Sequence, residues 1–358
     1  MLYQIYTGSY MNENGGDGIY LLEFDTERQT LRQICSYPEE SSNPSFLAVT
    51  PERVFAVSEL DECGYITSFA RDLATGELTK LDRLRTEGSA MCHLCLWPDG
   101  RHLSAANYMS GSLVVCQVQT DGGLGPVCDF KQHYGIGFDS KDRQEGPHVH
   151  STGVSGDGKR LYAADLGLDQ IFCYEISEDG RLTEKSGEYQ IRTPDGTGPR
   201  HFLFREEDRY LYVVTELGSR LFVYEKAEGE PVFREIQNIS TLPEGYTGFN
   251  AAAELRFSGD GKFLYVSNRG ANTLAVFRVS ETDGTVRPAG HFDCGGDFPR
   301  SFCITPDDRF VIVANQKSGS VAAFERDAIS GAAGEKAAEL AIPNAVFVQA
   351  VPKGGTRK

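Results

Sequence analysis

The clearest feature of the sequence is a repeated pair of short segments in which apolar and polar residues alternate. The first segment of a pair is a run such as LYAADLG, LYVVTEL or LYVSNRG. The second, after a short turn, is a run such as IFCYEI, LFVYEK or LAVFRV. A period of two is typical of half-buried β-strands, and no 3.6-residue period competes with it. The pattern therefore predicts an all-β chain.

The pairs recur at a nearly constant spacing. The residue that ends the first segment recurs about every fifty positions, which is near the length of one propeller blade. This position is occupied by Gly8, Glu59, Asn107, Asp165, Glu216, Asn268 and Asn315. Seven such units predict a seven-bladed β-propeller.

A further strand precedes most of the pairs and ends in a turn such as SGDGK or TPDDR. The first pair, within residues 2–24, has no such leading strand, whereas PNAVFVQAV near the C-terminus has no pair after it. We therefore expect the C-terminal strand to join the N-terminal blade, which would close the ring and remove exposed sheet edges. No linker interrupts the pattern, so residues 1–358 are expected to form a single domain, with a long loop over 132–146.

Composition narrows the function classes. The 358 residues carry 51 acidic and 35 basic side chains, a formal charge of −16, which disfavours nucleic acid and anionic lipid as partners. No basic segment followed by an apolar core begins the chain, and no apolar run approaches the ~20 residues of a membrane span. The nine cysteines are an odd number and lie mostly in strand-like runs, which favours free thiols and a cytoplasmic location.

Aligning the leading strands on their turns places one residue of each in an equivalent position at one mouth of the channel. These residues are Ser45, Cys92, His150, Arg200, Ala253 and Arg300. Residues that follow the second strands are expected at the same end, namely Glu59, Asn107, Asp165, Glu216, Arg269, Asn315 and Gln316. Buried unpaired charge is costly, so arginines gathered at one mouth of an acidic protein predict an anionic ligand. Arginine suits carboxylate or phosphate through bidentate hydrogen bonds.

Structural roles remain open for the same residues. Arg200 and Glu216 could tie adjacent strands together, and His150 could be a buried histidine with its hydrogen bonds satisfied. His148 and His150 are two apart, so both imidazoles could hold one metal ion, with Asp165 or Glu216 as a third ligand. No spacing compels such a site, and we expect neither a metal nor a cofactor. The sequence has no nucleophile elbow, phosphate loop or dinucleotide fingerprint.

Four segments resemble one known family. They are GPHVHSTGVSGDGKRLYAADLGLDQIFCYEI, GPRHFLFREEDRYLYVVTELGSRLFVYE, AAELRFSGDGKFLYVSNRGANTLAVF and PRSFCITPDDRFVIVANQKSGSVAAFE. In order and at blade spacing they are similar to the lactonase family of seven-bladed propellers, which contains 6-phosphogluconolactonases of the cycloisomerase type and carboxy-cis,cis-muconate cyclases. The resemblance covers essentially the whole chain and is strongest over about 146–325.

The resemblance implies a site of one histidine, two arginines and one glutamate. It places these catalytic roles on His150, Arg200, Glu216 and Arg269, with His148 as an alternative for the histidine. Arg300 and Gln316 are implied as substrate contacts. Ring position adds Asn315 and Asp165 to the predicted substrate-binding set, which also includes His148.

The main hypothesis is hydrolysis of a small anionic sugar lactone, 6-phospho-D-glucono-1,5-lactone, to 6-phosphogluconate. A cycloisomerase acting on a muconate-type dicarboxylate would use the same groups. A propeller that only binds other proteins is a third possibility, because a fold does not fix a function. The expected assembly is a monomer or a weak homo-oligomer.

Overall fold

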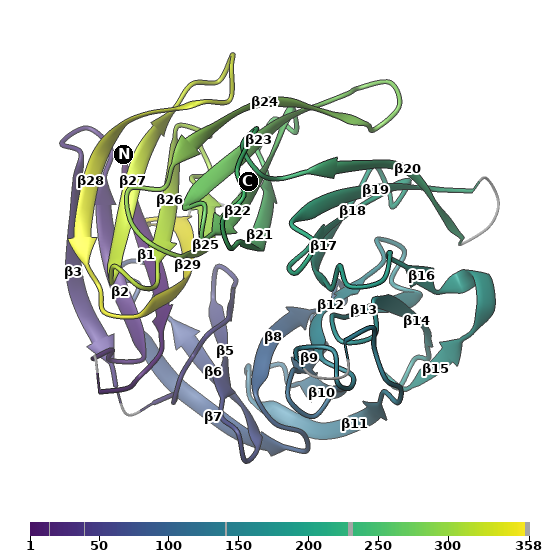
Figure 1. Ribbon diagram of the computed structural model, residues 1–358. Helices are drawn as coiled ribbons and strands as arrows, with labels where there is room; N and C mark the ends of the chain where they lie inside the picture. Colours follow the sequence, from purple (N-terminus) through teal and green to yellow (C-terminus); the bar gives the residue numbers. More distant parts are fainter. Residues whose placement is uncertain (14, 39, 140–141, 228–231, 355–358) are drawn as a thin grey trace. The chain divides into compact units, whose positions relative to one another are not determined.

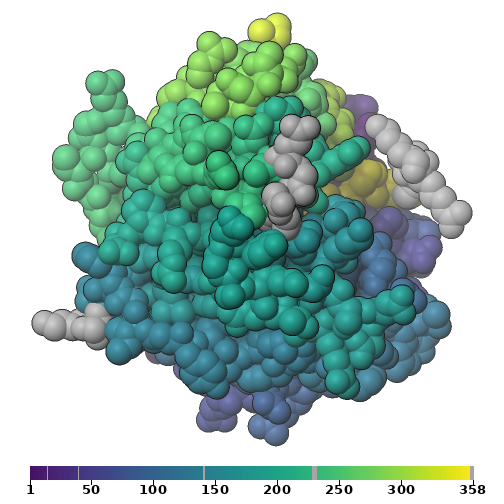
Figure 2. All heavy atoms as spheres, turned by 90° about the vertical axis from the view of Figure 1, so that its right-hand side faces the viewer, coloured from purple at the N-terminus to yellow at the C-terminus, as the bar shows by residue number. Residues whose placement is uncertain are grey.

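The computed structural model describes residues 1–13, 15–38, 40–139, 142–227 and 232–354; the remaining residues are grey in Figures 1 and 2. The described residues form strands β1 to β29 and one short 3-10 helix, η1 (Gly187–Tyr189). That helix, the only one in the described ranges, is too short and too polar to cross a membrane. The prediction of an all-β chain is confirmed.

Contacts between residues divide the chain into two compact units. Unit 1 comprises Met1–Ala56, Phe69–Lys80 and Thr241–Lys358, and unit 2 comprises Val57–Ser68 and Leu81–Ser240. Each unit is described by itself below. The expectation of a single domain over 1–358 stays a prediction.

Unit 1 contains three complete four-stranded antiparallel sheets. The first, in the order β29-β1-β2-β3, is formed by β29 (Ala345–Pro352), β1 (Leu2–Ser9), β2 (Ile19–Asp25) and β3 (Thr30–Tyr37). The second is formed by β21 (Ala251–Phe257), β22 (Phe263–Arg269), β23 (Thr273–Val279) and β24 (Val286–Asp293). The third is formed by β25 (Pro299–Ile304), β26 (Phe310–Asn315), β27 (Ser320–Arg326) and β28 (Ala333–Ala341).

The last strand completes the first sheet, as the sequence predicted. Strand β29 pairs antiparallel with β1, with Tyr3 opposite Pro352 and Gly8 opposite Phe347 (Figure 1). Gly8 is required at this edge because a Cβ on it would lie 2.0 Å from the Pro44 carbonyl oxygen.

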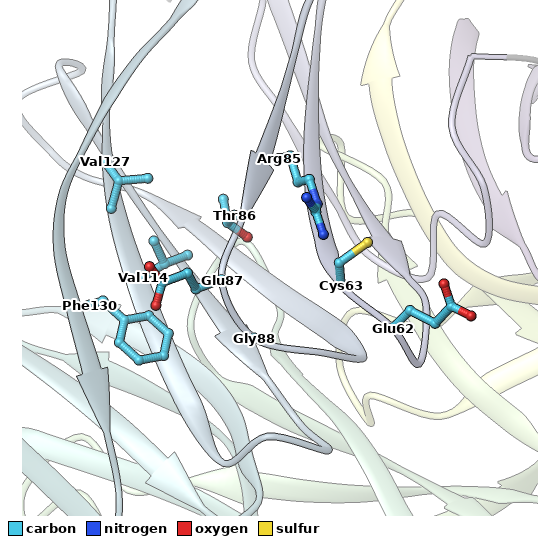
Figure 3. Close-up of a pocket in the computed structure, with 9 residues that line it drawn as sticks. All are labelled: Glu62, Cys63, Arg85, Thr86, Glu87, Gly88, Val114, Val127 and Phe130. Atoms are coloured by element: carbon cyan, nitrogen blue, oxygen red, sulfur yellow. The ribbon is translucent and has the colours of Figure 1, made fainter.

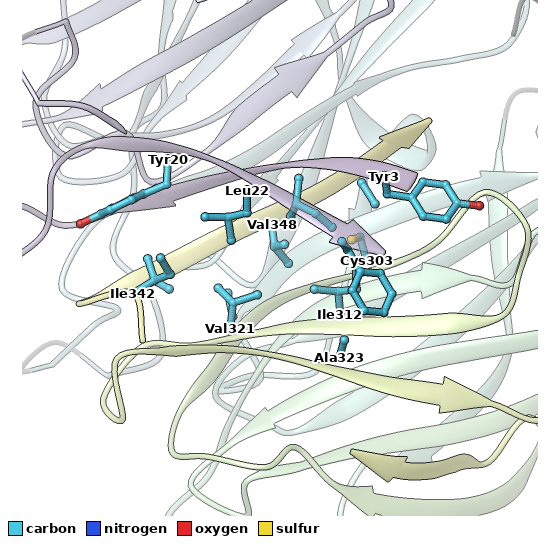
Figure 4. Packing of buried hydrophobic residues seen from close by; sticks show 14 of the residues in the cluster. Tyr3, Tyr20, Leu22, Cys303, Ile312, Val321, Ala323, Ile342 and Val348 are labelled. Carbon is cyan, nitrogen blue, oxygen red and sulfur yellow. The ribbon is translucent and has the colours of Figure 1, made fainter. Parts of the chain in front are cut away.

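The core of unit 1 is formed where the apolar faces of neighbouring sheets pack against each other. Figure 4 shows Leu22 of β2 and Val348 of β29 facing Ile312 and Val321 of the adjacent sheet. All four side chains are fully buried, and each contributes roughly 1.5–3 kcal/mol relative to an exposed position. Period-two alternation along the strands places these residues on the packed face.

Unit 2 also contains three complete antiparallel sheets. One is formed by β8 (Met91–Leu96), β9 (His102–Asn107), β10 (Ser112–Val118) and β11 (Leu124–Gln132). The next is formed by β12 (Val149–Val154), β13 (Arg160–Asp165), β14 (Gln170–Ile176) and β15 (Leu182–Lys185), with β16 (Ile191–Arg192) paired to β14. The third is formed by β17 (Pro199–Arg205), β18 (Tyr210–Thr215), β19 (Arg220–Lys226) and β20 (Phe233–Ser240).

One more four-stranded sheet has residues in both units, and it is formed by β4 (Leu47–Val49), β5 (Arg53–Glu59), β6 (Gly64–Arg71) and β7 (Leu78–Thr86). The described residues therefore form seven sheets, one for each repeat counted in the sequence. The longest connection is the segment between β11 and β12, where a long loop was expected.

Candidate active site

The site in unit 2 depends on a bulge that recurs at the start of the leading strands. In β12, Val149 pairs with Asp165 and Ser151 pairs with Ala164, so His150 has no opposite residue. The same register shift leaves Arg200 unmatched in β17 and Cys92 unmatched in β8. A bulge of this kind re-aims side chains near the end of a sheet. Three residues that the sequence alignment treated as equivalent therefore share one backbone geometry.

Three predicted catalytic residues lie together around a buried carboxylate. The Arg200 Nε donates to Glu216 Oε2 over 2.9 Å, and both side chains are almost completely buried. The His150 Nε2 lies 3.9 Å from the same Glu216 oxygen, which is too long for a direct hydrogen bond. The backbone N–H of Glu216 donates to the Gly198 carbonyl, which holds the residue at the end of β18. His150, Arg200 and Glu216 thus lie together in unit 2, and the catalytic roles predicted for them stay predictions.

A fourth residue, Arg143, completes this charge cluster from the loop between β11 and β12. Its Nη2 donates to Glu216 Oε1 over 2.6 Å, and its Nε donates to the Tyr108 hydroxyl over 2.8 Å. Glu216 is therefore shared by two guanidinium groups, one on each carboxylate oxygen. Two arginines and one glutamate leave a net positive charge in a protein whose overall charge is −16.

Tyr108, directly after β9, connects the arginine to the two histidines. Its ring stacks on His148 with centroids 4.4 Å apart and meets His150 edge-on at 5.6 Å. Burial raises the pKa of Tyr108 to about 12, and the nearby Arg143 offsets this only in part. The Tyr108 hydroxyl is therefore protonated at neutral pH and acts as a fixed hydrogen-bonding group.

Further imidazoles and a thiol surround His150. The His201 ring lies 5.2 Å from the rings of both His150 and His93, and Arg200 Nη1 is 3.3 Å from His201 Nε2. The Cys92 Sγ lies 3.9 Å from His150 Nδ1. Strict alternation would have sent His93 and His201 to the face opposite Cys92 and Arg200. Because the bulges interrupt the alternation, His93 and His201 lie on the same side of their strands as Cys92 and Arg200.

His148 has partners different from those of His150. Its Nδ1 lies 2.9 Å from the Tyr108 carbonyl oxygen, and its Nε2 lies 3.1 Å from Glu145 Oε1. It precedes β12, so the two imidazoles are not successive members of one regular strand face. Within the described ranges, no group of three or more His, Cys, Asp or Glu side chains has metal-binding geometry.

Asp165 is buried and binds the backbone of His148. Its Oδ1 accepts the backbone N–H groups of His148 and Leu168, and its Oδ2 lies 2.6 Å from His133 Nδ1. These contacts fix the end of β13 and the start of β12. Substrate binding by Asp165 and His148 stays a prediction.

The other predicted residues belong to unit 1. Arg269 Nε donates to the Ala251 carbonyl oxygen over 3.1 Å, and its guanidinium lies 5.3 Å from the Phe298 ring centre. Arg300 occupies a bulge in β25 and lies over the Tyr10 ring. Asn315 Nδ2 donates to the Cys294 carbonyl oxygen, and the Gln316 backbone N–H donates to Phe298. The catalytic role of Arg269 and the binding roles of the other three stay predictions.

Sequence reasoning missed four residues of the unit 2 cluster: Tyr108, Arg143, His93 and His201. Arg143 lies in a loop, and no periodicity indicates where a loop side chain will point. Tyr108 follows the repeat position Asn107 directly, in the same way that Gln316 follows Asn315. That equivalence was the available signal for Tyr108.

A separate pocket of about 480 Å³ lies in unit 2, lined by the turn before β6, by the end of β7 and the residues after it, and by β10 and β11. Figure 3 shows Arg85 and Cys63 on one side of it and Val127 and Phe130 on the other. Its charged lining residues are Glu62, Arg85 and Glu87, so carboxylates outnumber the single guanidinium. An anion is better accommodated by the cluster around Glu216, and none of the predicted site residues lines this pocket.

The chain belongs to a family described as "Lactonase, 7-bladed beta-propeller", whose profile matches residues 4–350. Its fold is therefore the seven-bladed β-propeller that the seven repeats predicted, with the last strand in the first blade.

Two relatives are named 6-phosphogluconolactonase. The protein from Bacillus subtilis (strain 168) is 32% identical over 346 residues, covering 96% of this chain and 97% of its own. The protein from Formosa agariphila is 29% identical over 353 residues, covering 96% and 98%. Among solved structures, the periplasmic gluconolactonase of Pseudomonas aeruginosa superimposes with a TM-score of 0.89 at 31% identity, covering 99% of this chain and 100% of its own.

Proposed function

We propose that this protein is a lactonase that hydrolyses 6-phospho-D-glucono-1,5-lactone to 6-phosphogluconate. The observation that carries the proposal is the buried Glu216 carboxylate, shared by Arg200 and Arg143 with His150 beside it, in a member of a lactonase family. The net positive charge of this cluster suits a small anionic substrate.

The reaction needs a water molecule to attack the lactone carbonyl carbon, after which the ring C–O bond breaks. Negative charge grows on the carbonyl oxygen in the transition state, and a fixed guanidinium such as that of Arg200 stabilises it. Arg200 is held in place by its bond to Glu216, so it does not reorganise during the step. Stabilising charge with a preorganised donor is worth several kcal/mol in comparable sites, of the order of 3 kcal/mol.

His150 is the proposed general base. An imidazole titrates near neutral pH, so it accepts a proton from the attacking water and returns it to the ring oxygen that leaves. Glu216 and the edges of the Tyr108 and His201 rings limit the orientations open to His150. A lactone is already an activated ester, so no covalent nucleophile is required.

The test is lactone opening by the purified protein, followed as acid release above the spontaneous rate. We expect His150→Ala and Arg200→Ala to lower kcat/KM at least about 100-fold, the range observed for lost bases and oxyanion donors. Arg209→Ala is the matched control, because Arg209 is exposed, pairs with Glu225 and lies over the Tyr210 ring, away from the cluster around Glu216. No catalysis by the wild type, or full activity of Arg200→Ala, would contradict the proposal. Preference for a muconate over the lactones would favour the cycloisomerase instead.

We further propose a cytoplasmic location. All nine cysteines are free, and five of them are buried, which fits a reducing compartment. Fractionation of the native host's cells, with the protein recovered from the periplasm or medium, would contradict this.

A further inference from the structure

The relatives differ in one property that matters for this site. Two are named for a phosphorylated lactone and another for gluconolactone, at 32%, 29% and 31% identity. Overall similarity therefore does not decide whether a phosphate is recognised. We propose that Arg143 is the residue that binds the phosphate group of the substrate, which makes this chain selective for a phosphorylated sugar lactone. The inference rests on the lactonase function proposed above.

The donors of Arg143 are only partly used inside the protein. Its Nη2 and Nε bond to Glu216 and Tyr108, while no described residue bonds to its Nη1. The Arg143 side chain is 40% exposed, whereas Glu216 is 2% exposed and Arg200 is 3% exposed. Arg143 is thus the cation of the cluster that solvent and an incoming anion can reach.

Arg143 and Arg200 bind different oxygens of the Glu216 carboxylate, so the two guanidinium groups can bind different parts of the substrate. Arg200 contacts Oε2, the oxygen nearest His150, and Arg143 contacts Oε1. In a 6-phosphorylated 1,5-aldonolactone, the carbonyl carbon and the carbon that bears the phosphorylated CH2 group flank the ring oxygen, so the carbonyl oxygen and the phosphate lie on different sides of it and need two neighbouring but distinct donors. With the carbonyl at Arg200 and His150, the phosphate end is left for the more exposed guanidinium.

The groups around Arg143 keep its guanidinium protonated. Burial lowers the pKa of its guanidinium, but the adjacent Glu216 carboxylate and the Tyr108 hydroxyl raise it by more, so the net shift is upward. The other carboxylates of this loop are Asp139, Asp142 and Glu145, all of them exposed; Glu145 Oε1 lies 3.1 Å from His148 Nε2. Because these carboxylates are exposed, water screens their charge, whereas the Arg143 guanidinium lies against the buried Glu216.

The loop holds Arg143 in one position although it has no regular secondary structure there. Arg143 has a φ of 59°, in the left-handed region that non-glycine residues rarely adopt. The next residue, Gln144, is 1% exposed, and its side-chain Nε2 donates to the Leu166 carbonyl oxygen over 2.9 Å. Strained backbone that is retained by its neighbours is a feature of ligand-binding sites. A fixed arginine loses little entropy on binding an anion.

The experiment compares kcat/KM for 6-phosphoglucono-1,5-lactone and glucono-1,5-lactone in the wild type, Arg143→Ala and Arg143→Gln. We expect the wild type to prefer the phosphorylated lactone. Both variants should lose about 10- to 100-fold of that preference, the range for a charge-assisted bidentate pair. The ratio isolates phosphate recognition, because disturbance of Glu216 or Arg200 affects both substrates alike. Arg143→Gln retains an amide for Glu216 and Tyr108, so it keeps the test decisive if Arg143→Ala fails to fold.

The control is Arg83→Ala, since Arg83 is also an exposed arginine over a tyrosine ring, that of Tyr65. It should leave the ratio unchanged. An equal loss on both lactones, no loss at all, or a wild type that prefers the unphosphorylated lactone overturns the inference while the lactonase function stands. Failure of the wild type to open either lactone removes the proposed function and this inference with it.

Discussion

The imidazole of His133 lies 2.6 Å from the carboxylate of Asp165, and both side chains are almost completely buried. The other ring nitrogen lies 2.8 Å from the Tyr174 hydroxyl. Burial and nearby carboxylates raise the pKa of Tyr174, so this hydroxyl is protonated at neutral pH. A carboxylate only accepts, so the facing Nδ1 of His133 donates to Asp165, whose other oxygen accepts the backbone N–H of His148.

This chain of bonds predicts a graded loss of stability. His133→Ala should lower the free energy of unfolding by about 2–3 kcal/mol, because a buried carboxylate loses a donor. Tyr174→Phe should cost only about 1 kcal/mol, since it removes one neutral hydrogen bond. Urea denaturation followed by tyrosine fluorescence measures both. Equal losses in the two variants would show that Asp165 does not depend on His133.

Removing the charge of Glu216 tests its role in holding two arginines. Glu216→Gln should lower kcat/KM for the lactone about 30-fold or more, because two neighbouring guanidinium groups lose the carboxylate between them. The matched control is Glu225→Gln, which alters an exposed pair with Arg209 and should change activity less than twofold. Wild-type activity in Glu216→Gln would mean that Arg200 is positioned by other contacts.

Two glycines near the Arg143 loop differ in the space around them. A Cβ on Gly167 would lie 1.9 Å from the Gly146 carbonyl oxygen, whereas a Cβ on Gly146 would meet no atom within 4 Å. Gly167→Ala should therefore displace the loop and lower kcat/KM about 10- to 100-fold, as small misplacements of binding groups do. Gly146→Ala is the control and should retain activity. Equal behaviour of the two variants would contradict a loop that must sit in one place.

The free energy of unfolding should decrease as the pH rises above about 9. Burial raises the pKa of Tyr6 and Tyr265 from 10.0 to about 12 and that of Cys116 and Cys303 from 9.0 to about 12. The folded state therefore favours the neutral forms, and this contribution is complete below about pH 9 and is lost as pH rises towards 12. Urea denaturation between about pH 7 and 11 measures the slope. Cys116→Ala should flatten it above pH 9, and an unchanged slope would contradict burial of this thiol.

Much of the fold could be predicted because each blade repeats the same local pattern. The positions from Gly8 to Asn315 identified seven sheets, and the unmatched run at 343–351 identified β29 as the partner of β1. Ring position also placed His150, Arg200 and Glu216 at one end of their strands, while their catalytic roles came from the resemblance to the lactonase family. Period and spacing carry this information, since strand alternation is a local property.

The remainder of the site depends on departures from that pattern. Because of the bulges at Cys92 and Arg200, His93 and His201 lie on the same face as the residues that precede them, which a regular strand would not allow. The alternation of apolar and polar residues in a single sequence does not reveal where a bulge occurs. Arg143 reaches Glu216 from a loop whose path is set by tertiary contacts such as Gln144 to Leu166.

The pairing of β29 with β1 also sets an order of events during synthesis. Strand β1 leaves the ribosome some 340 residues before its partner, a delay of about half a minute at ordinary elongation rates. Throughout that interval the hydrogen-bonding edge and the apolar face that β29 later covers are open to other chains. A nascent molecule of this protein is thus most prone to aggregate before its final eight-residue strand has been translated.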